Sequence, residues 1–370
     1  MIYLDNGATS FHKPPRVKQA MNRAMERCAN PGRGGYRAAM EAARVLYDCR
    51  ETAGKLFHCD PEQVVLTCNC THGLNMAIRT LVKPGDTVVV SGFEHNAVMR
   101  PLYALNAKVT VAGRKLFHWD DTLEQWETAL KQKPKAAVVT HVSNVFGYIL
   151  PISEIAALCS QYGVPFILDA AQSAGSIPID FQGTGAAFAA MPGHKGLLGP
   201  QGTGLLLCAR EPEPLLYGGT GGNSMSKEMP PDLPDRGEAG TANVPGIAGL
   251  AAGMDYLYQT GVEAIGRKEK LQADTCAREL ENMGFRVYTG EHRSGTLSFL
   301  PQGDCEDAAQ AFARCGIALR AGLHCAPLAH ESAGTLETGT LRISFGHDAN
   351  PQQTRHLLQA ARFLKERGEI

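Results

Sequence analysis

Short apolar runs alternate with helical patterns between residues 64 and 208, and this alternation constrains the fold more than any other feature of the chain. The runs that we expect to form buried strands lie at 64–67, 87–91, 136–140, 164–168, 186–190 and 204–208. Helical patterns such as 152–162 stand between several of them. Strands that alternate with helices favour a mainly parallel sheet covered by helices. The sequence therefore predicts an α/β fold.

A segment rich in glycine and proline, from Glu211 to Pro245, interrupts this pattern and is expected to form a long functional or interface loop. Further elements follow it, namely helices at 247–258 and 263–283, strands at 286–288 and 295–299, and a final helix opening at Asn350-Pro351. With 370 residues, the chain is long enough for one large and one small domain. We expect a large domain over 15–245 and a smaller α+β domain formed by 1–14 and 246–370.

Composition argues against several classes of function. The 36 basic and 37 acidic residues give a net charge of -1 without long runs of one sign, which disfavours binding to nucleic acid or to an anionic membrane. Neither a signal peptide nor a membrane span is predicted, so we expect a cytoplasmic protein. Eleven cysteines, an odd number, are interpreted as reduced thiols. Cys68 and Cys70 lack a second cluster with zinc spacing, so no metal site is expected.

A single lysine, Lys195, stands among glycines in the segment 191–204, directly after a predicted strand. A lysine that is partly desolvated and close to other cations has a lowered pKa, as a Schiff-base nucleophile requires. Lys195 is therefore a candidate nucleophile. The alternative is a loop lysine whose ammonium group simply reaches solvent.

Three other positions suit a flat, phosphorylated cofactor. Asp169 follows the strand at 164–168, where α/β sites form, and a carboxylate there can keep the ring nitrogen of pyridoxal phosphate protonated. The turn 69–73 opens a helix and offers backbone N–H groups and the Thr71 hydroxyl to a phosphate. His95 ends a strand and could stack on the ring. The alternatives are a helix N-cap for Asp169 and a structural role for His95.

Near the carboxyl end, Cys325 lies in a glycine-bearing loop with Arg320 and His324, two neighbours that favour a thiolate. Arg342 lies in the apolar run 341–345, where a buried arginine needs an anionic partner. Either a substrate carboxylate held in a bidentate clamp or a structural ion pair meets that need.

Taken in order over nearly the whole chain, these segments resemble the class V aminotransferase family, in particular its group II cysteine desulfurases and selenocysteine lyases. The resembling motifs are Tyr3-Leu-Asp-Asn-Gly-Ala8, Glu94-His95-Asn96, His141-Val-Ser-Asn144, Asp169-x-x-Gln172, Gly193-His-Lys195 and Arg320-x-Gly-x-x-Cys325. The last motif, RxGxxC, is typical of group II. The resemblance implies fold type I of the pyridoxal-phosphate transferases, with a large mainly parallel-sheet domain and a smaller α+β domain.

The resemblance also implies which residues bind the cofactor, pyridoxal 5'-phosphate. Lys195 would hold it as a Schiff base, Asp169 would pair with the pyridine nitrogen, and Gln172 would hydrogen-bond the ring hydroxyl. His95 would stack on the ring. The phosphate would be bound by residues of both subunits of a homodimer, namely Thr71 and His194 of one and Thr241 of the other.

The implied reaction converts L-cysteine, or L-selenocysteine, to L-alanine. Asn144, Arg320 and Arg342 would bind the substrate, Lys195 would act as the base, and His95 would lie beside the reacting atoms. Cys325 would take the sulfur as a persulfide and pass it to a sulfur-acceptor protein.

Two departures from the family pattern predict fewer phosphate contacts: Pro192 replaces a serine, and Cys70 replaces a threonine, that many relatives have. His72 also replaces a common acidic residue. Two other functions stay open. One is an aminotransferase, lyase or epimerase acting on another amino acid, for which Cys325 would be incidental. The other is a non-catalytic sulfur-transfer scaffold, although a scaffold has no need of Lys195, Asp169 and Gln172 together.

Overall fold

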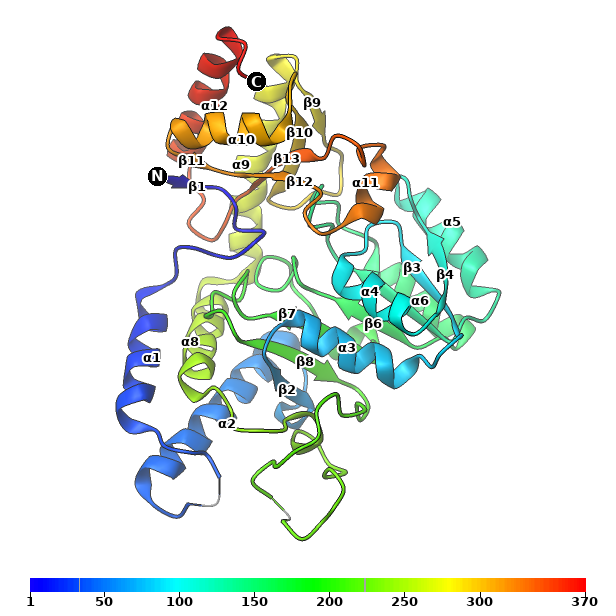
Figure 1. Cartoon of the computed structure of the whole chain (residues 1–370), viewed down its shortest axis with the longest axis vertical. Coiled ribbons are helices and arrows are strands. Elements are labelled where there is room, and N and C mark those ends of the chain that lie inside the picture. The colour runs from blue at the N-terminus through cyan, green and yellow to red at the C-terminus, as the bar shows by residue number, and fades with distance from the viewer. Residues whose placement is uncertain (33, 223) are drawn as a thin grey trace.

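The computed structural model describes residues 1–32, 34–222 and 224–370, and a seven-stranded sheet lies at its centre (Figure 1). Its strands are β2 (Val64–Thr67), β3 (Thr87–Ser91), β4 (Lys108–Ala112), β5 (Ala136–Thr140), β6 (Phe166–Asp169), β7 (Phe188–Pro192) and β8 (Gly204–Cys208). They are ordered β2-β8-β7-β6-β5-β3-β4 across the sheet. β8 runs antiparallel to both neighbours, whereas the pairings among β3 to β7 are parallel. The predicted mainly parallel sheet is confirmed.

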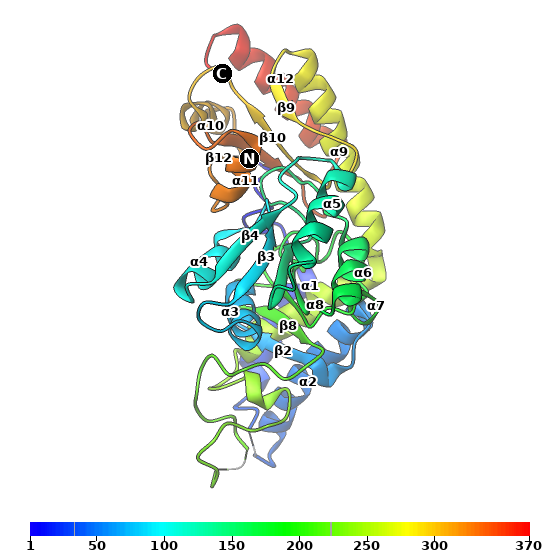
Figure 2. The same cartoon turned by 90° about the vertical axis from the view of Figure 1, so that its right-hand side faces the viewer.

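Helices cover both faces of this sheet, as the side view in Figure 2 shows. Residues alternate between the faces of a strand, so Val89 of β3 packs in one apolar layer while Val88 and Val90 pack in the other. The first layer includes residues of α2 (Arg37–Phe57), α5 (Trp119–Leu130), α6 (Ile152–Tyr162), the single turn α7 (Phe181–Thr184) and α8 (Val244–Thr260). The second includes residues of α3 (Cys70–Leu81) and α4 (Asn96–Ala104). α1 (Pro15–Arg27) packs against α2 and α8.

A smaller antiparallel sheet lies beside the chain termini, at the top of Figure 1, and is ordered β12-β13-β10-β9. Its strands are β9 (Arg286–Tyr288), β10 (Thr296–Leu300), β12 (Arg320–Gly322) and β13 (Thr340–Ser344). The helices of this part are α9 (Val262–Asn282), α10 (Cys305–Arg314), α11 (Pro327–Ala333) and α12 (Pro351–Glu366). β1 (Ile2–Tyr3) pairs in parallel with β11 (Ile317–Ala318), so the amino terminus joins the carboxyl-terminal third. The division into two domains stays a prediction.

The strand expected at 186–190 is displaced, because β7 spans Phe188–Pro192. Its last residue, Pro192, pairs with Gly204 of β8. Proline has no N–H to continue a ladder, so the strand ends there. As a result, only Gly193 and His194 separate the end of the strand from Lys195.

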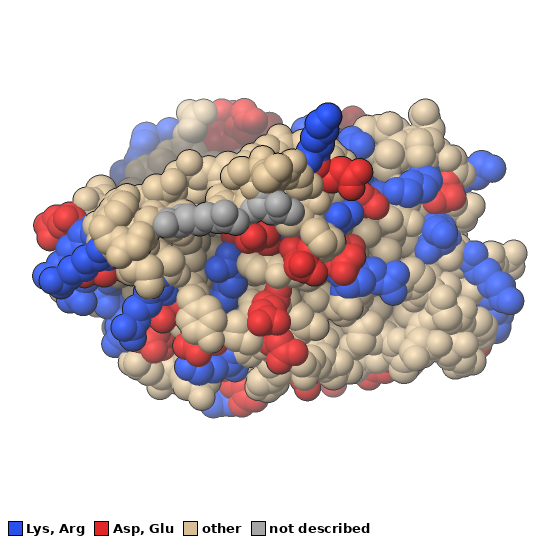
Figure 3. All heavy atoms as spheres, turned by 90° about the horizontal axis from the view of Figure 1, so that it is seen from below, with Lys and Arg blue, Asp and Glu red and all other residues tan. Residues whose placement is uncertain are grey.

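Two features bear on interactions with large partners. Among the described helices, none is both long enough and apolar enough to cross a membrane. On the face shown in Figure 3, basic and acidic side chains are interspersed.

Candidate active site

A cavity of about 240 Å³ lies where the carboxyl ends of the central parallel strands meet the loop that follows β12. Parallel strands end at one edge of a sheet, which is why residues far apart in the sequence gather there. All the predicted site residues except Thr241 line this cavity, namely Thr71, His95, Asn144, Asp169, Gln172, His194, Lys195, Arg320, Cys325 and Arg342. Cys70 and Pro192, the two departures from the family pattern, line it as well.

Lys195 lies in the turn that follows β7. Burial lowers the pKa of its ammonium group, and the nearby guanidinium of Arg342 lowers it further. The turn needs the glycine that follows, because a Cβ on Gly196 would lie 2.2 Å from the carbonyl oxygen of Ala174. The site therefore shifts Lys195 toward its neutral amine, the form in which lysine is a nucleophile or a base.

Asp169 is the last residue of β6, and its side chain is buried. Its Oδ1 accepts hydrogen bonds from the N–H of Ala171 at 2.9 Å and from the thiol of Cys70 at 3.6 Å. Burial raises the pKa of this carboxyl group, while the Ala171 hydrogen bond and Lys195 lower it. Oδ2 has no hydrogen-bond partner among the described residues, so it remains available to a group bound in the cavity.

The amino end of α3 forms another wall of the cavity. The side chain of Asn69 accepts a hydrogen bond of 2.9 Å from the N–H of His72 and caps the helix. Because the first N–H groups of a helix have no acceptor within it, those of Cys70 and Thr71 remain available to an anion. His194 is held by a 3.1 Å contact between its Nδ1 and the Thr9 hydroxyl.

His95 precedes α4 and caps it, because its Nδ1 accepts a 3.0 Å hydrogen bond from the N–H of Ala97. Burial, aided by Lys195, lowers the pKa of His95 to about 4, so the ring is neutral. Since Nδ1 is the acceptor, the proton of the neutral ring lies on Nε2. The structural role considered for His95 is thus present, and the ring still lines the cavity.

Glu94 precedes His95 and lies outside the cavity lining; the sequence did not indicate its role, although it belongs to a family motif. It is fully buried, and its Oε1 accepts hydrogen bonds from the Ser91 hydroxyl at 2.5 Å and the Thr140 N–H at 2.8 Å. Burial raises the pKa of Glu94 to about 8. Because these bonds join the ends of β3 and β5, Glu94 fixes the position of His95.

Cys325 lies in an unusual loop, since both His324 and Cys325 have positive φ angles, of 49° and 57°. The ring of His324 is buried with its Nε2 3.2 Å from the Thr340 carbonyl oxygen, and burial lowers its pKa to about 2. His324 is therefore neutral and cannot supply the positive charge expected beside the thiol. The cations that line the cavity with Cys325 are Arg320, Arg342 and, when protonated, Lys195.

Arg342 forms a structural ion pair, one of the two alternatives that the sequence left open for this residue. The side chain is 1% exposed, and its guanidinium donates to the Asp5 carboxylate at 2.5 Å and to the Asn144 carbonyl oxygen at 3.0 Å. Nε has no hydrogen-bond partner among the described residues. An arginine has five N–H donors, so the ion pair does not exhaust its capacity to hold an anion.

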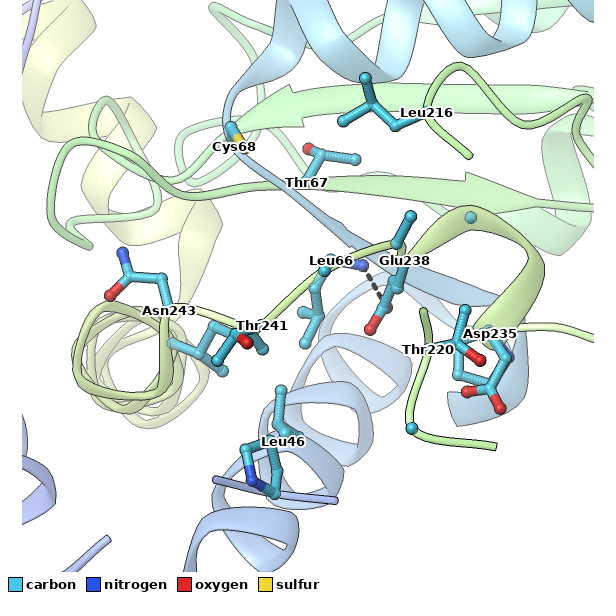
Figure 4. Close-up of a pocket in the computed structure, with 18 of the residues that line it drawn as sticks. Leu46, Leu66, Thr67, Cys68, Leu216, Thr220, Asp235, Glu238, Thr241 and Asn243 are labelled. Atoms are coloured by element: carbon cyan, nitrogen blue, oxygen red, sulfur yellow. Dashed lines mark hydrogen bonds between the residues drawn. The ribbon is translucent and has the colours of Figure 1, made fainter. Parts of the chain in front are cut away.

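Thr241 lies outside this cavity. It lines a second hollow of about 550 Å³ together with Thr67, Cys68 and Glu238, as Figure 4 shows. The loop that carries Thr241 is fixed by Glu238, which accepts hydrogen bonds from the Leu66 N–H and the Arg50 guanidinium. Among the described residues, the two hollows share no lining residue.

The model of the class V aminotransferase family matches residues 2–357. The chain belongs to this family. Two curated relatives are similar over most of their length. A probable cysteine desulfurase of Methanothermobacter thermautotrophicus is 32% identical, which covers 96% of this chain and 92% of the relative. A cysteine desulfurase of Haloferax volcanii is also 32% identical and covers 93% and 85%, respectively.

Solved structures agree with this class V assignment. The apo cysteine desulfurase from Thermococcus onnurineus NA1 has a TM-score of 0.91 at 30% identity, covering 98% of this chain and 94% of that one. The cysteine desulfurase CsdA from Escherichia coli, in an S-sulfonic acid form, has a TM-score of 0.86 at 27% identity, with 99% and 94% covered. The resemblance to class V cysteine desulfurases, and the fold type I architecture that it implies, are therefore confirmed.

Proposed function

We propose that this class V enzyme is a cysteine desulfurase that uses Lys195 and Cys325 to convert L-cysteine to L-alanine. The observation that carries the proposal is the single cavity shared by Lys195, Asp169, Cys325 and Arg342. Cys325 is an exposed thiol that lines this cavity together with Arg320 and Arg342, and a thiolate there can attack the sulfur of a bound substrate. The reaction of an aminotransferase does not require a thiol at this position.

The described residues fit pyridoxal 5'-phosphate, the cofactor on which the family depends. Lys195 Nζ would carry it, the uncommitted Oδ2 of Asp169 would face its ring nitrogen, and Gln172 and His95 would contact the ring. The phosphate would lie at the start of α3, near Thr71 and His194. When bound, the cofactor withdraws electrons from the α-carbon of the substrate.

The substrate carboxylate would be held by the remaining donors of Arg342, together with Asn144 and Arg320. Lys195 Nζ, once free and neutral, would take the α-proton. The Cys325 thiolate then attacks the substrate sulfur: the carbon–sulfur bond breaks, a sulfur–sulfur bond forms, and the substrate carbon gains a proton to become alanine. The persulfide on Cys325 would be delivered to a sulfur-acceptor protein or a thiol reductant.

The test compares Cys325→Ala with the parent protein, loaded with pyridoxal phosphate and supplied with L-cysteine and a thiol reductant. Loss of both alanine and sulfide in the variant would support persulfide chemistry at Cys325. The matched control is Cys315→Ala, because Cys315 is also exposed but follows α10, away from the cavity. Equal alanine formation by parent and Cys325→Ala would contradict persulfide chemistry at Cys325, and absence of alanine in both would favour chemistry on another amino acid. L-Selenocysteine, tested in parallel, reports whether the site accepts selenium.

We also propose a homodimer in which Thr241 completes the phosphate site of the second subunit. The support is that Thr241 lies in a hollow separate from the Lys195 cavity of its own chain. Thr241→Ala should then weaken cofactor binding. Mixed dimers of Thr241→Ala and Lys195→Ala subunits should contain one site altered at both positions and one unaltered site, and so recover activity.

A cytoplasmic location is proposed because all eleven cysteines are free thiols.

A further inference from the structure

Cys70 lies at the start of α3 and faces the carboxylate at the end of β6. Its side chain is buried, lines the Lys195 cavity and places Sγ 3.6 Å from Oδ1 of Asp169. Burial raises the pKa of this thiol well above its usual value, and Asp169 raises it further. The proton therefore remains on sulfur, and Cys70 is the hydrogen-bond donor to Asp169.

The two oxygens of Asp169 are thereby made unequal. Oδ1 accepts from both the Ala171 N–H and the Cys70 thiol. No described residue donates to Oδ2. Because two donors bind Oδ1, the plane of the Asp169 carboxylate is fixed. Oδ2 is then free to accept a hydrogen bond from a group bound in the cavity. A hydrogen bond to the ionised form also favours that form, which opposes the effect of burial on Asp169.

We propose that Cys70 is a positioning residue, whose thiol fixes Oδ1 of Asp169 so that Oδ2 meets the ring nitrogen of the bound cofactor. The inference rests on the proposed role of Asp169 in cofactor binding. It gives Cys70 a role distinct from that of Cys325, which is exposed. It also distinguishes Cys70 from Cys68, which lines the second hollow.

The chemistry of the side chain makes the proposal specific. A hydroxyl is a stronger donor than a thiol, while valine has no donor and fills the space of the thiol with one additional methyl group. Cys70→Ser should keep the hold on Asp169, and Cys70→Val should remove it without leaving a large cavity. A merely structural role for a small buried side chain would give the opposite order, because the polar serine is the poorer apolar filler.

The first measurement uses the full chain without cofactor and records the infrared S–H stretching bands. The band lost in Cys70→Val identifies the Cys70 thiol. We expect Asp169→Asn to shift that band to higher frequency, since an amide oxygen is a weaker acceptor than a carboxylate. The matched control is the band lost in Cys208→Val, because Cys208 is buried and donates to the Leu206 carbonyl instead. A Cys70 band that is unchanged in Asp169→Asn would overturn the proposal.

The second measurement uses the loaded protein and follows the dissociation constant and absorbance band of the bound cofactor. We expect Cys70→Val to weaken cofactor binding by roughly tenfold, equivalent to about 1.4 kcal/mol, and to shift the band. Cys70→Ser should restore both. If the parent retains cofactor and both variants bind it identically, the positioning role is overturned. If the parent binds no cofactor at all, the proposed function fails, whereas the infrared result still reports on the Cys70–Asp169 bond.

Discussion

The side-chain amide of Asn144 donates a 2.7 Å hydrogen bond to the backbone carbonyl of His324, the residue before Cys325. A second bond, of 2.8 Å, joins the N–H of Asn96 to the carbonyl of Cys325. Both ties come from segments that follow strands of the central sheet. The loop with two consecutive positive φ angles is therefore held from the side on which the cofactor would bind.

We expect Asn144→Ala to lower alanine formation by roughly ten- to a hundredfold, because the variant loses a tie to the Cys325 loop and a ligand for the substrate. Steady-state kinetics with L-cysteine provide the measurement. Asn282→Ala, at an exposed position near the end of α9, is the control and should have the parental rate. An unaltered rate in Asn144→Ala would contradict the role given to this amide.

The Asp5–Arg342 pair makes a prediction about stability. Asp5→Asn leaves a guanidinium that is 1% exposed without its carboxylate, so the free energy of unfolding should fall by about 3 to 5 kcal/mol. Denaturant unfolding of the cofactor-free chain measures it. Glu41→Gln breaks the exposed pair with Arg37 and should cost less than about 1 kcal/mol. Equal costs for the two variants would show that burial of Arg342 has no energetic consequence.

Gly147, in the loop between β5 and α6, approaches β10 too closely for a side chain. Its φ is 67°, and a Cβ there would lie 2.1 Å from the Thr296 carbonyl oxygen. Gly163 has a similar φ of 66° but open space around it. Gly163→Ala should thus cost only about 1 kcal/mol of backbone strain. Gly147→Ala should cost at least about 3 kcal/mol. Similar unfolding midpoints for the two variants would refute the steric argument.

His330 makes stability depend on pH. Its ring is buried and its Nδ1 contacts the Thr335 hydroxyl at 2.7 Å. Burial lowers its pKa from 6.5 to about 4. As pH falls through this window, the unfolded chain binds a proton at His330 that the folded chain does not. The titration of His330 therefore lowers the free energy of unfolding by about 1.4 kcal/mol per pH unit within this window.

The check is His330→Gln, which removes this contribution. The stability difference between parent and variant should shrink as pH is lowered from 6.5 toward 4, when followed by urea unfolding. The other titrating groups, such as Glu94, are common to both proteins and cancel in the comparison. A difference that is constant with pH would mean that His330 has the same pKa in the folded and the unfolded chain.

Apolar patterns located most of the strands and two residues of the cavity for one physical reason, whereas Gln172, Asn144 and His194 were implied only by the family resemblance. Asp169 and Lys195 closely follow apolar runs that form neighbouring strands, and parallel strands bring their carboxyl ends to one edge. The strand at 108–112 was not predicted, because the edge strand β4 mixes exposed and buried positions and has no continuous apolar run. The displacement of β7 reflects its register against β8, a partner that no local pattern specifies.

Contacts between distant segments could not be predicted either. Arg342 needs an anion on physical grounds, yet nothing local identifies Asp5, which lies 337 positions away. The motif around Cys325 suggested that His324 favours the thiolate of Cys325, whereas the fold buries the His324 ring against Thr340. The bond from Cys70 to Asp169 likewise depends on how α3 packs against β6.

The most direct test of the central claim is a mass measurement of the loaded protein after one equivalent of L-cysteine, without reductant, followed by peptide mapping. We predict one added sulfur atom on the peptide that contains Cys325, with one equivalent of alanine released. Alanine release without added sulfur on Cys325, or added sulfur on another cysteine, would contradict it.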